Sequence, residues 1–204
     1  MIFQIIIIEY MKVLLTGFEP FGERKINNAW GVANGFSGCP DIDILKIPVS
    51  FKRAHNKVIE LLHSGIYNLI VMVGETSFTK DYVRLERLAI NYKDSNLSDN
   101  DGVIADDECL ICNAPMAYFT KFPVKKTAEA LKTEGYKVKV TNSTGTFVCN
   151  SLYFNILHYL ATHNSSSTAL FIHVPASEEV ISVDEMKTTV KAIIDHFSEA
   201  LCSH

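Results

Sequence analysis

Short apolar runs that alternate with amphipathic helical patterns most constrain how this chain can fold. Five runs of strand length, rich in valine, isoleucine and leucine, occupy residues 13–16, 42–47, 69–73, 136–141 and 169–174. Continuous apolar runs of this length are typical of strands buried on both faces, as in parallel sheets. Helical patterns lie between several of them, so we predict βαβ units and a mostly parallel sheet covered by helices on both faces.

Several of the helical patterns have well-marked ends. The first stops near Gly65, a residue suited to a left-handed C-terminal cap. The second starts at Pro123 and stops at Gly135. The last opens with Ser182 and Glu185 in the spacing of a capping box. These signals predict helices long enough to cover a sheet.

The length of 204 residues suits one α/β domain with a single core. Because a complete strand pattern starts at Met11, we interpret residues 1–10 as an N-terminal extension and residues 11–204 as the domain. An extra edge strand is the alternative for residues 1–10. Their apolar run is too short to span a bilayer and lacks the marks of a signal peptide.

The net charge limits the partners that suit the chain, and the number of cysteines limits its cellular compartment. The chain carries 19 basic and 23 acidic side chains, a net charge of -4. This balance gives no excess of positive charge to bind nucleic acid or an anionic membrane, and we expect neither as a partner. The cysteines number five, an odd count that fits a secreted disulfide framework poorly. We therefore predict a cytoplasmic protein.

Cys149 is the candidate nucleophile. It lies in TNSTGTFVCNSLYF, where a strand ends, a Ser/Thr/Gly turn follows and a helix begins. The thiol is thus predicted in a first helical turn, where the positive end of the helix favours a thiolate and lowers the pKa of the cysteine. The backbone N–H groups there could also hold an oxyanion. An ordinary buried core thiol is the alternative.

His173 is the candidate base. It ends the apolar strand just before Pro175, at the carboxyl edge where open α/β sheets gather their ligands. The start of the helix that carries Cys149 belongs to the same edge. A neutral imidazole there can take a thiol proton and return it to a leaving amine. A hydrogen-bonded core histidine is the alternative.

Glu86 is the candidate for orienting this base. Alternation in VRLERLAIN places it on the same strand face as Leu88 and Ile90, so it is expected to be partly buried. A buried carboxylate needs a partner, and accepting an imidazole N–H would fix the tautomer of the histidine. Pairing with Arg84 or Arg87 at the surface is the alternative. The surrounding residues 82–112 include the turn-rich KDSNLSDNDG and predict a hairpin-like excursion near the site.

Six blocks of sequence, in order along the chain, carry a resemblance to a known family. They are LLTGFEPFGERKINNAW from Leu14, ERLAIN from Glu86, DNDG from Asp99, NAPMAYFTKFPVKK from Asn113, TNSTGTFVCN ending at Asn150, and FIHVP from Phe171. In this order and spacing the chain resembles the type I pyroglutamyl peptidases, also called pyrrolidone-carboxylate peptidases.

The resemblance implies a cysteine exopeptidase that hydrolyses the amide bond after an N-terminal L-pyroglutamyl residue of peptides. The family's glutamate, cysteine and histidine fall on Glu86, Cys149 and His173, with an acyl-enzyme formed on the cysteine. It implies a three-layer α/β/α sandwich with a twisted, mostly parallel mixed central sheet. It also implies homo-oligomers, dimers or tetramers, with pyroglutamylated peptides as partners and neither cofactor nor metal.

The resemblance also places a substrate pocket. Two phenylalanines that enclose the pyrrolidone ring in the family correspond to Phe18 and Phe21, and a nearby asparagine corresponds to Asn27. An aromatic slot suits a lactam, because pyroglutamate has no charged α-amine to desolvate. Core packing is the alternative for the two phenylalanines.

Departures from the family pattern lie after the third strand, in GETSFTKDYVRLER. Glu75 replaces a commonly neutral residue beside the pocket, and an acid there would need its own partner. Lys80 stands near the place of an arginine and lacks its bidentate fork. The alternative functions are therefore a divergent amidase or a non-catalytic binder on the same fold. A thiol redox protein is a further alternative, because Cys109 and Cys112 form CLIC.

Overall fold

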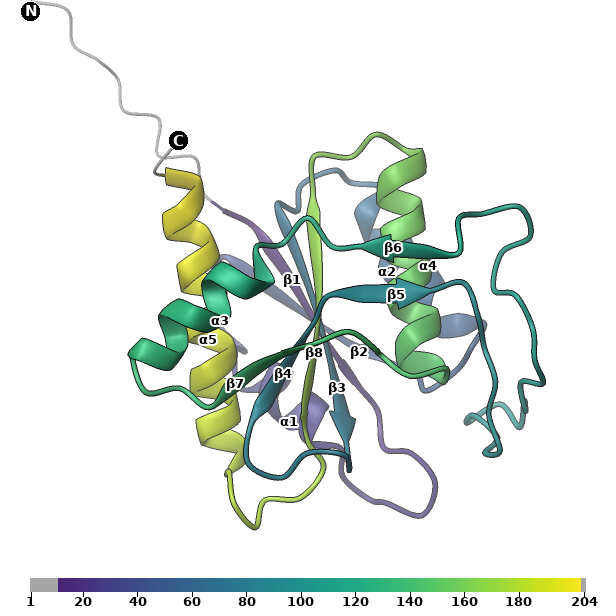
Figure 1. Ribbon diagram of the computed structural model, residues 1–204, viewed down its shortest axis with the longest axis horizontal. Coiled ribbons are helices and arrows are strands. Elements are labelled where there is room, and N and C mark those ends of the chain that lie inside the picture. Colours follow the sequence, from purple (N-terminus) through teal and green to yellow (C-terminus); the bar gives the residue numbers. More distant parts are fainter. Residues whose placement is uncertain (1–10, 203–204) are drawn as a thin grey trace, which may run out of the picture.

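The structure is a computed structural model that describes the backbone of residues 11–202 and the side chains of residues 11–200. The predicted extension, residues 1–10, lies outside the described residues. A central sheet of six strands is sandwiched between two layers of helices, and a small two-stranded sheet lies at its side (Figure 1). The predicted three-layer α/β/α fold is confirmed.

The central sheet has the order β2-β1-β3-β8-β4-β7. Neighbouring strands from β2 to β8 run parallel, β4 is antiparallel to β8, and β7 is parallel to β4. The sheet is therefore mixed and mostly parallel, as predicted. Its strands are β1 (Val13–Phe18), β2 (Ile42–Ile47), β3 (Leu69–Thr76), β4 (Val83–Glu86), β7 (Val138–Thr141) and β8 (Thr168–Pro175).

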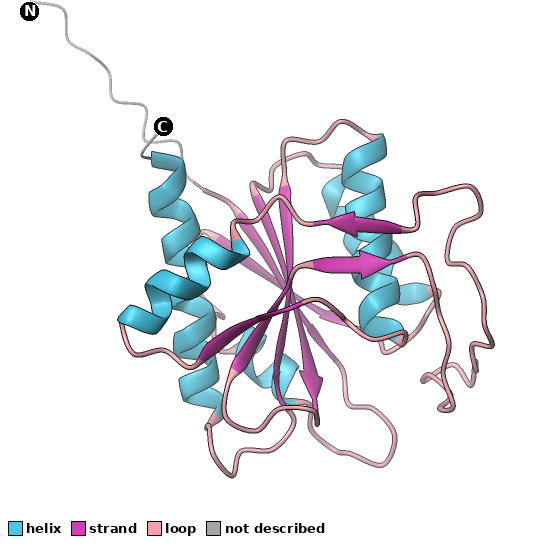
Figure 2. Cartoon of the chain, in the orientation of Figure 1, coloured by secondary structure: helices cyan, strands magenta, loops and turns pink. Residues whose placement is uncertain are grey.

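Helices cover both faces of this sheet (Figure 2). On one face lie α1 (Asn28–Asn34), α3 (Val124–Thr133) and α5 (Val183–Cys202); on the other lie α2 (Arg53–Leu62) and α4 (Val148–Thr162). None of the helices in the described part of the chain is long and apolar enough to cross a membrane.

Strands β1, β3 and β8 are mostly apolar because both of their faces are buried. In β1, Val13 and Leu15 pack against the layer formed by α1, α3 and α5, whereas Leu14 packs against α2 and α4. This alternation explains why the sequence shows continuous apolar runs rather than alternating ones.

The predicted helix ends are confirmed by backbone geometry and hydrogen bonds. Gly65 after α2 and Gly135 after α3 have φ angles of 68° and 92°, which glycine adopts without a Cβ penalty. At the start of α5, the Glu185 carboxylate accepts from the Ser182 N–H at 2.8 Å, and the Glu185 N–H donates to the Ser182 hydroxyl at 3.3 Å. This is a reciprocal capping box.

The predicted hairpin-like excursion is confirmed in part. Lys93 and Glu108 form an antiparallel bridge across the turn-rich segment, with N–H···O distances of 2.8 and 3.0 Å, but the strands before that segment pair elsewhere. Strand β4 lies inside the central sheet, between β8 and β7. The chain leaves that sheet at Arg87, and β5 (Leu88–Ile90) pairs with β6 (Ala117–Phe119), a strand much later in the sequence. Leu88 and Ile90 therefore do not share a strand face with Glu86, because they belong to a different sheet.

Asn150 fastens α4 to the small sheet. Its Nδ2 donates to the carbonyls of Ile90 and Tyr92, at 2.9 and 2.8 Å, and its Oδ1 accepts from the Ile90 N–H at 2.9 Å. The side chain is fully buried. This amide therefore satisfies backbone groups of an extended segment that would otherwise lack partners.

We predict that Asn150→Ala lowers the free energy of unfolding by about 2–4 kcal/mol, because it leaves buried backbone groups without partners. Urea unfolding followed by circular dichroism measures this change. Asn155→Ala on the same helix is the matched control, because Asn155 donates within its own helix, to the Ser151 carbonyl. A loss for Asn150→Ala no larger than that of the control would contradict the anchoring role.

Candidate active site

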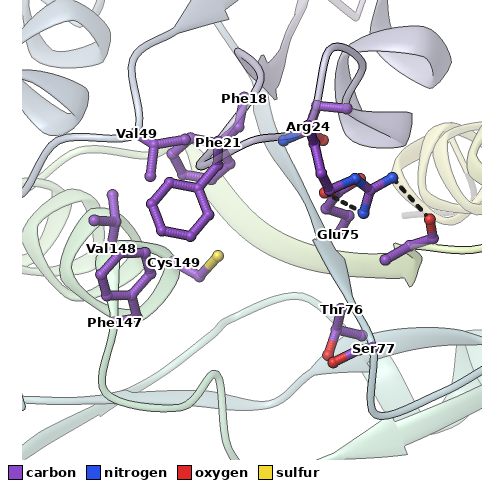
Figure 3. A pocket seen from close by; sticks show the side chains of 12 residues that line it. Phe18, Phe21, Arg24, Val49, Glu75, Thr76, Ser77, Phe147, Val148 and Cys149 are labelled. Carbon is purple, nitrogen blue, oxygen red and sulfur yellow. Dashed lines mark hydrogen bonds and ion pairs between the residues drawn. The ribbon is translucent and has the colours of Figure 1, made fainter. Parts of the chain in front are cut away.

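A cavity of about 360 Å³ opens where β1 and β3 end and α4 begins (Figure 3). The Cys149 thiol faces it, and most of the remaining lining is apolar or aromatic. Apolar residues of the lining include Phe18, Phe21, Val49, Phe147 and Val148, and polar ones include Arg24, Asn27, Glu75, Thr76 and Ser77.

Cys149 lies in the first turn of α4, as predicted, and its sulfur rests over strand β3. A Cβ added at Gly74 would lie 3.1 Å from the Cys149 Sγ and 2.8 Å from the Phe171 Cζ. Gly74 pairs with His173 on the neighbouring strand, and the Phe171 and His173 rings are in contact, with centroids 4.9 Å apart. The thiol and the imidazole therefore lie on the same face of the sheet, over adjacent strands.

The imidazole of His173 is held by Glu86. The Nδ1 of His173 lies 2.8 Å from the Glu86 Oε1, and both side chains are buried. Since a carboxylate accepts and does not donate, this contact places the proton on Nδ1 and leaves Nε2 as an acceptor. The site thus contains an oriented imidazole that can receive a proton.

Glu86 has two further partners, which explains how a carboxylate with no exposed surface is accommodated. The Nε of Arg84 lies 3.1 Å from its Oε1, and the Thr141 hydroxyl donates to its Oε2 at 2.6 Å. The alternatives considered for Glu86 are thus both partly correct: it binds the imidazole and also pairs with Arg84. The pairing is buried rather than superficial, because Arg84 is itself largely covered.

The expected lowering of the Cys149 pKa is wrong for the protein without substrate. Burial, and after it the carboxylates of Glu86 and Glu75, raise the pKa of the Cys149 thiol to about 12, although the residue's own backbone N–H lowers it. These effects outweigh the helix N-terminus. The thiol is therefore protonated near neutral pH and needs a base to become a nucleophile.

Aromatic rings form the apolar wall of the cavity. The Phe21 and Phe147 ring centroids are 5.2 Å apart, and Phe51 packs edge-on against Phe147 at 5.3 Å. Phe18 and Phe21 both line the cavity, although Phe18 is almost completely buried. Asn27 lines it as well, while its Oδ1 accepts from the Ala29 N–H at the start of α1.

Glu75 also lines the cavity, and its partner is Arg24. The Arg24 Nη1 lies 2.8 Å from the Glu75 Oε1, and the Asn28 N–H donates to the Oε2 at 2.9 Å. Lys80 does not line the cavity; it is exposed and lies 3.8 Å from the Glu179 carboxylate.

The DNDG turn supports the cavity from outside. The Asn100 Nδ2 donates to the Glu19 Oε1 at 2.9 Å and to the Pro20 carbonyl at 3.0 Å. Asp99 is buried and accepts from the Phe51 N–H at 2.9 Å. The DNDG turn therefore positions both the loop that carries Phe21 and the segment that carries Phe51, whose ring packs against Phe147.

Sequence comparisons identify the family. A model of the pyroglutamyl peptidase family matches residues 11–201. The chain belongs to the pyroglutamyl peptidase family. It is therefore an enzyme, a cysteine peptidase.

Named relatives and solved structures agree with this membership. A pyrrolidone-carboxylate peptidase of Thermococcus kodakarensis is 37% identical over 173 residues, 83% of each chain. One of Brachyspira hyodysenteriae is 35% identical over 174 residues, 84% of this chain and 86% of the relative. Pyroglutamyl peptidase I of Bacillus amyloliquefaciens superposes with a TM-score of 0.86 at 28% identity, covering 93% of this chain and 97% of that one.

Three residues of this site are not predicted individually from the sequence. Arg24 reaches the cavity from the loop after β1, inside a block that was recognised only as a whole. Gly74 provides the space for the Cys149 sulfur; the glycine is visible in the sequence, but the approach of α4 to it is not. Phe147 is the residue before α4, and its place in TNSTGTFVCN is the only sign in the sequence that it belongs to the site.

Cys109 and Cys112 take no part in the cavity. Both are exposed free thiols in the loop between β5 and β6, away from any helix start. Among residues 11–200, no group of three or more His, Cys, Asp or Glu side chains is arranged to bind a metal.

We predict that Gly74→Ala lowers peptidase activity at least about tenfold, because the new methyl would collide with the buried Phe171 ring and displace the Cys149 sulfur. Steady-state kinetics on folded protein test this. Gly31→Ala is the control, because its Cβ would meet a Val183 methyl at 3.3 Å, far from the thiol. Unchanged activity in Gly74→Ala would show that the sulfur does not depend on this space.

Proposed function

We propose that this enzyme removes an N-terminal L-pyroglutamyl residue from peptides by hydrolysing the amide bond that follows it. The observation that carries the proposal is the position of the Cys149 thiol. It faces a small, mostly apolar cavity and lies on the same face of the sheet as the hydrogen-bonded pair of His173 and Glu86. Membership of the pyroglutamyl peptidase family supports the same substrate.

The shape and polarity of the cavity support a lactam. Pyroglutamate is a small neutral ring, so its transfer into an aromatic slot needs no ion to be desolvated. Phe18, Phe21 and Phe147 supply that slot. A volume of about 360 Å³ suits one ring with its carbonyl carbon at the thiol.

In the proposed mechanism, the Nε2 of His173 takes the Cys149 proton as the sulfur attacks the pyroglutamyl carbonyl carbon. The oxyanion that forms is held by backbone N–H groups in the first turn of α4. The intermediate collapses when His173 gives the proton to the leaving peptide amine, which leaves a thioester on Cys149. Water, deprotonated by His173, hydrolyses the thioester and releases pyroglutamate.

Glu86 acts in this proposal through the histidine. Its carboxylate keeps the proton on Nδ1 and stabilises the imidazolium that forms during attack. Because Arg84 and Thr141 share that carboxylate, it stays in place through the cycle. A neutral amide at this position would keep most of the shape and lose the charge.

The setting of the enzyme is also proposed. We propose residues 11–204 as one catalytic domain, acting in the cytoplasm, where free cysteines stay reduced. A homo-oligomer, a dimer or tetramer, is supported by exposed apolar side chains in and beside the loop between β5 and β6: Leu97, Ile104, Met116 and Phe119.

The proposal predicts release of a fluorophore from an L-pyroglutamyl amide by the purified protein under reducing conditions. Cys149→Ala and His173→Ala should each lower kcat/KM at least about 10³-fold, because each removes a reacting group. Glu86→Gln should cost less. Fluorescence kinetics with each variant measure these losses.

Cys109→Ser is the matched control, because it changes an exposed thiol outside the cavity. It should leave kcat/KM unchanged, and a large loss would favour the thiol redox alternative. No release from any pyroglutamyl amide by a folded sample would favour a divergent amidase or a non-catalytic binder.

A further inference from the structure

An ion pair between Arg24 and Glu75 stands in the wall of the cavity. Glu75 belongs to β3, and Arg24 reaches it from the loop after β1, with 2.8 Å between Nη1 and Oε1 (Figure 3). The Arg24 Nη2 also donates to the Ala176 carbonyl at 2.9 Å, which fixes the guanidinium. The Glu75 Oε2 accepts from the Asn28 N–H at 2.9 Å.

The pair is unusual for a pocket that has to hold a neutral ring. Only 13% of the Glu75 side chain is exposed, whereas 40% of the Arg24 side chain is. Burial raises the pKa of Glu75 above its usual range, and the Asn28 N–H and Arg24 offset part of this rise. The carboxylate thus remains in a largely apolar wall because two donors are aimed at it.

Charges around the Cys149 sulfur are arranged in matched pairs. Glu86 on β4 is paired with Arg84, and Glu75 on β3 is paired with Arg24. Both carboxylates oppose formation of a thiolate at Cys149. His173 on β8 and the start of α4 complete the surroundings. Each guanidinium therefore offsets one carboxylate that would otherwise work against the nucleophile.

We propose that Arg24 is a positioning and specificity residue, which neutralises Glu75 so that the pocket accepts a neutral lactam ring and the thiolate can form beside it. The inference rests on the proposed function. Each Glu75 oxygen already has one donor and keeps a free lone pair, which suits a ring N–H. Without Arg24 the same carboxylate would attract a cationic ring, such as an N-terminal proline.

A double-mutant cycle tests the pair with Arg24→Met, Glu75→Gln and the double variant, using the L-pyroglutamyl amide. Arg24→Met alone should lower kcat/KM about tenfold, because it exposes the cavity to an uncompensated charge. In the Glu75→Gln background the same change should cost less than about threefold. Equal losses in both backgrounds would overturn the proposal, because Arg24 would then act through the Ala176 carbonyl.

Alkylation of Cys149 by iodoacetamide gives a readout that needs no turnover. Mass spectrometry of the peptide containing Cys149 separates it from the exposed thiols. At pH 8 the rate of alkylation should fall about tenfold in Arg24→Met and rise in Glu75→Gln, because the fraction of thiolate changes. Rates equal to that of the wild type in both variants would overturn the charge balance. This result stands even if no pyroglutamyl amide is cleaved, so it is separate from failure of the proposed function.

L-prolinamide tests the selectivity, because its ring nitrogen is cationic at pH 7 where a lactam nitrogen is neutral. It should inhibit Arg24→Met at a concentration about tenfold lower than the wild type, and the double variant should lose this gain. Equal inhibition of the wild type and Arg24→Met would overturn the specificity role. Circular dichroism confirms that the compared variants are folded.

Discussion

The buried carboxylate of Glu86 joins the three strands on which the site is built. It lies on β4, accepts from the Thr141 hydroxyl on β7, and holds the imidazole of His173 on β8. A carboxylate without exposed surface would cost several kcal/mol if these partners were absent. The antiparallel entry of β4 makes the contact possible. In the antiparallel register of β4 and β8, Arg84 lies directly opposite His173. Glu86 is two residues further along β4 and therefore lies on the same face of the sheet.

The parts of the fold that the sequence predicts are those that follow local rules. Strands β1, β3 and β8 are mostly apolar on both faces because helices cover both, and the helix ends carry glycine and capping residues. Cys149 and His173 could be assigned to one edge, since helix starts and parallel strand ends meet there. The β4 strand does not follow these rules. Its four residues, VRLE, include Arg84 and Glu86, which satisfy each other inside the protein and look like surface charges in a sequence.

Several residues that line the cavity could be predicted, but the contacts between them could not. Resemblance placed Phe18, Phe21, Asn27 and Glu75 at the pocket, and the structure puts all of them in its lining. The partner of Glu75 could not be predicted, because the ion pair depends on how the loop after β1 folds back over β3. Contacts between elements far apart in sequence are set by packing, and propensity or spacing carries no information about them.

The raised pKa of Cys149 determines whether the site starts its reaction from a thiol or from a thiolate. A helix N-terminus stabilises an anion by about 0.3–2 kcal/mol, so it cannot alone offset burial together with two nearby carboxylates. The reaction therefore starts from a neutral thiol at Cys149 and not from a thiolate. In the proposed mechanism, charge appears when the sulfur attacks, and the Glu86 carboxylate then faces an imidazolium while the first turn of α4 faces an oxyanion. Interactions that strengthen at that moment lower the barrier, because they favour the transition state over the bound substrate.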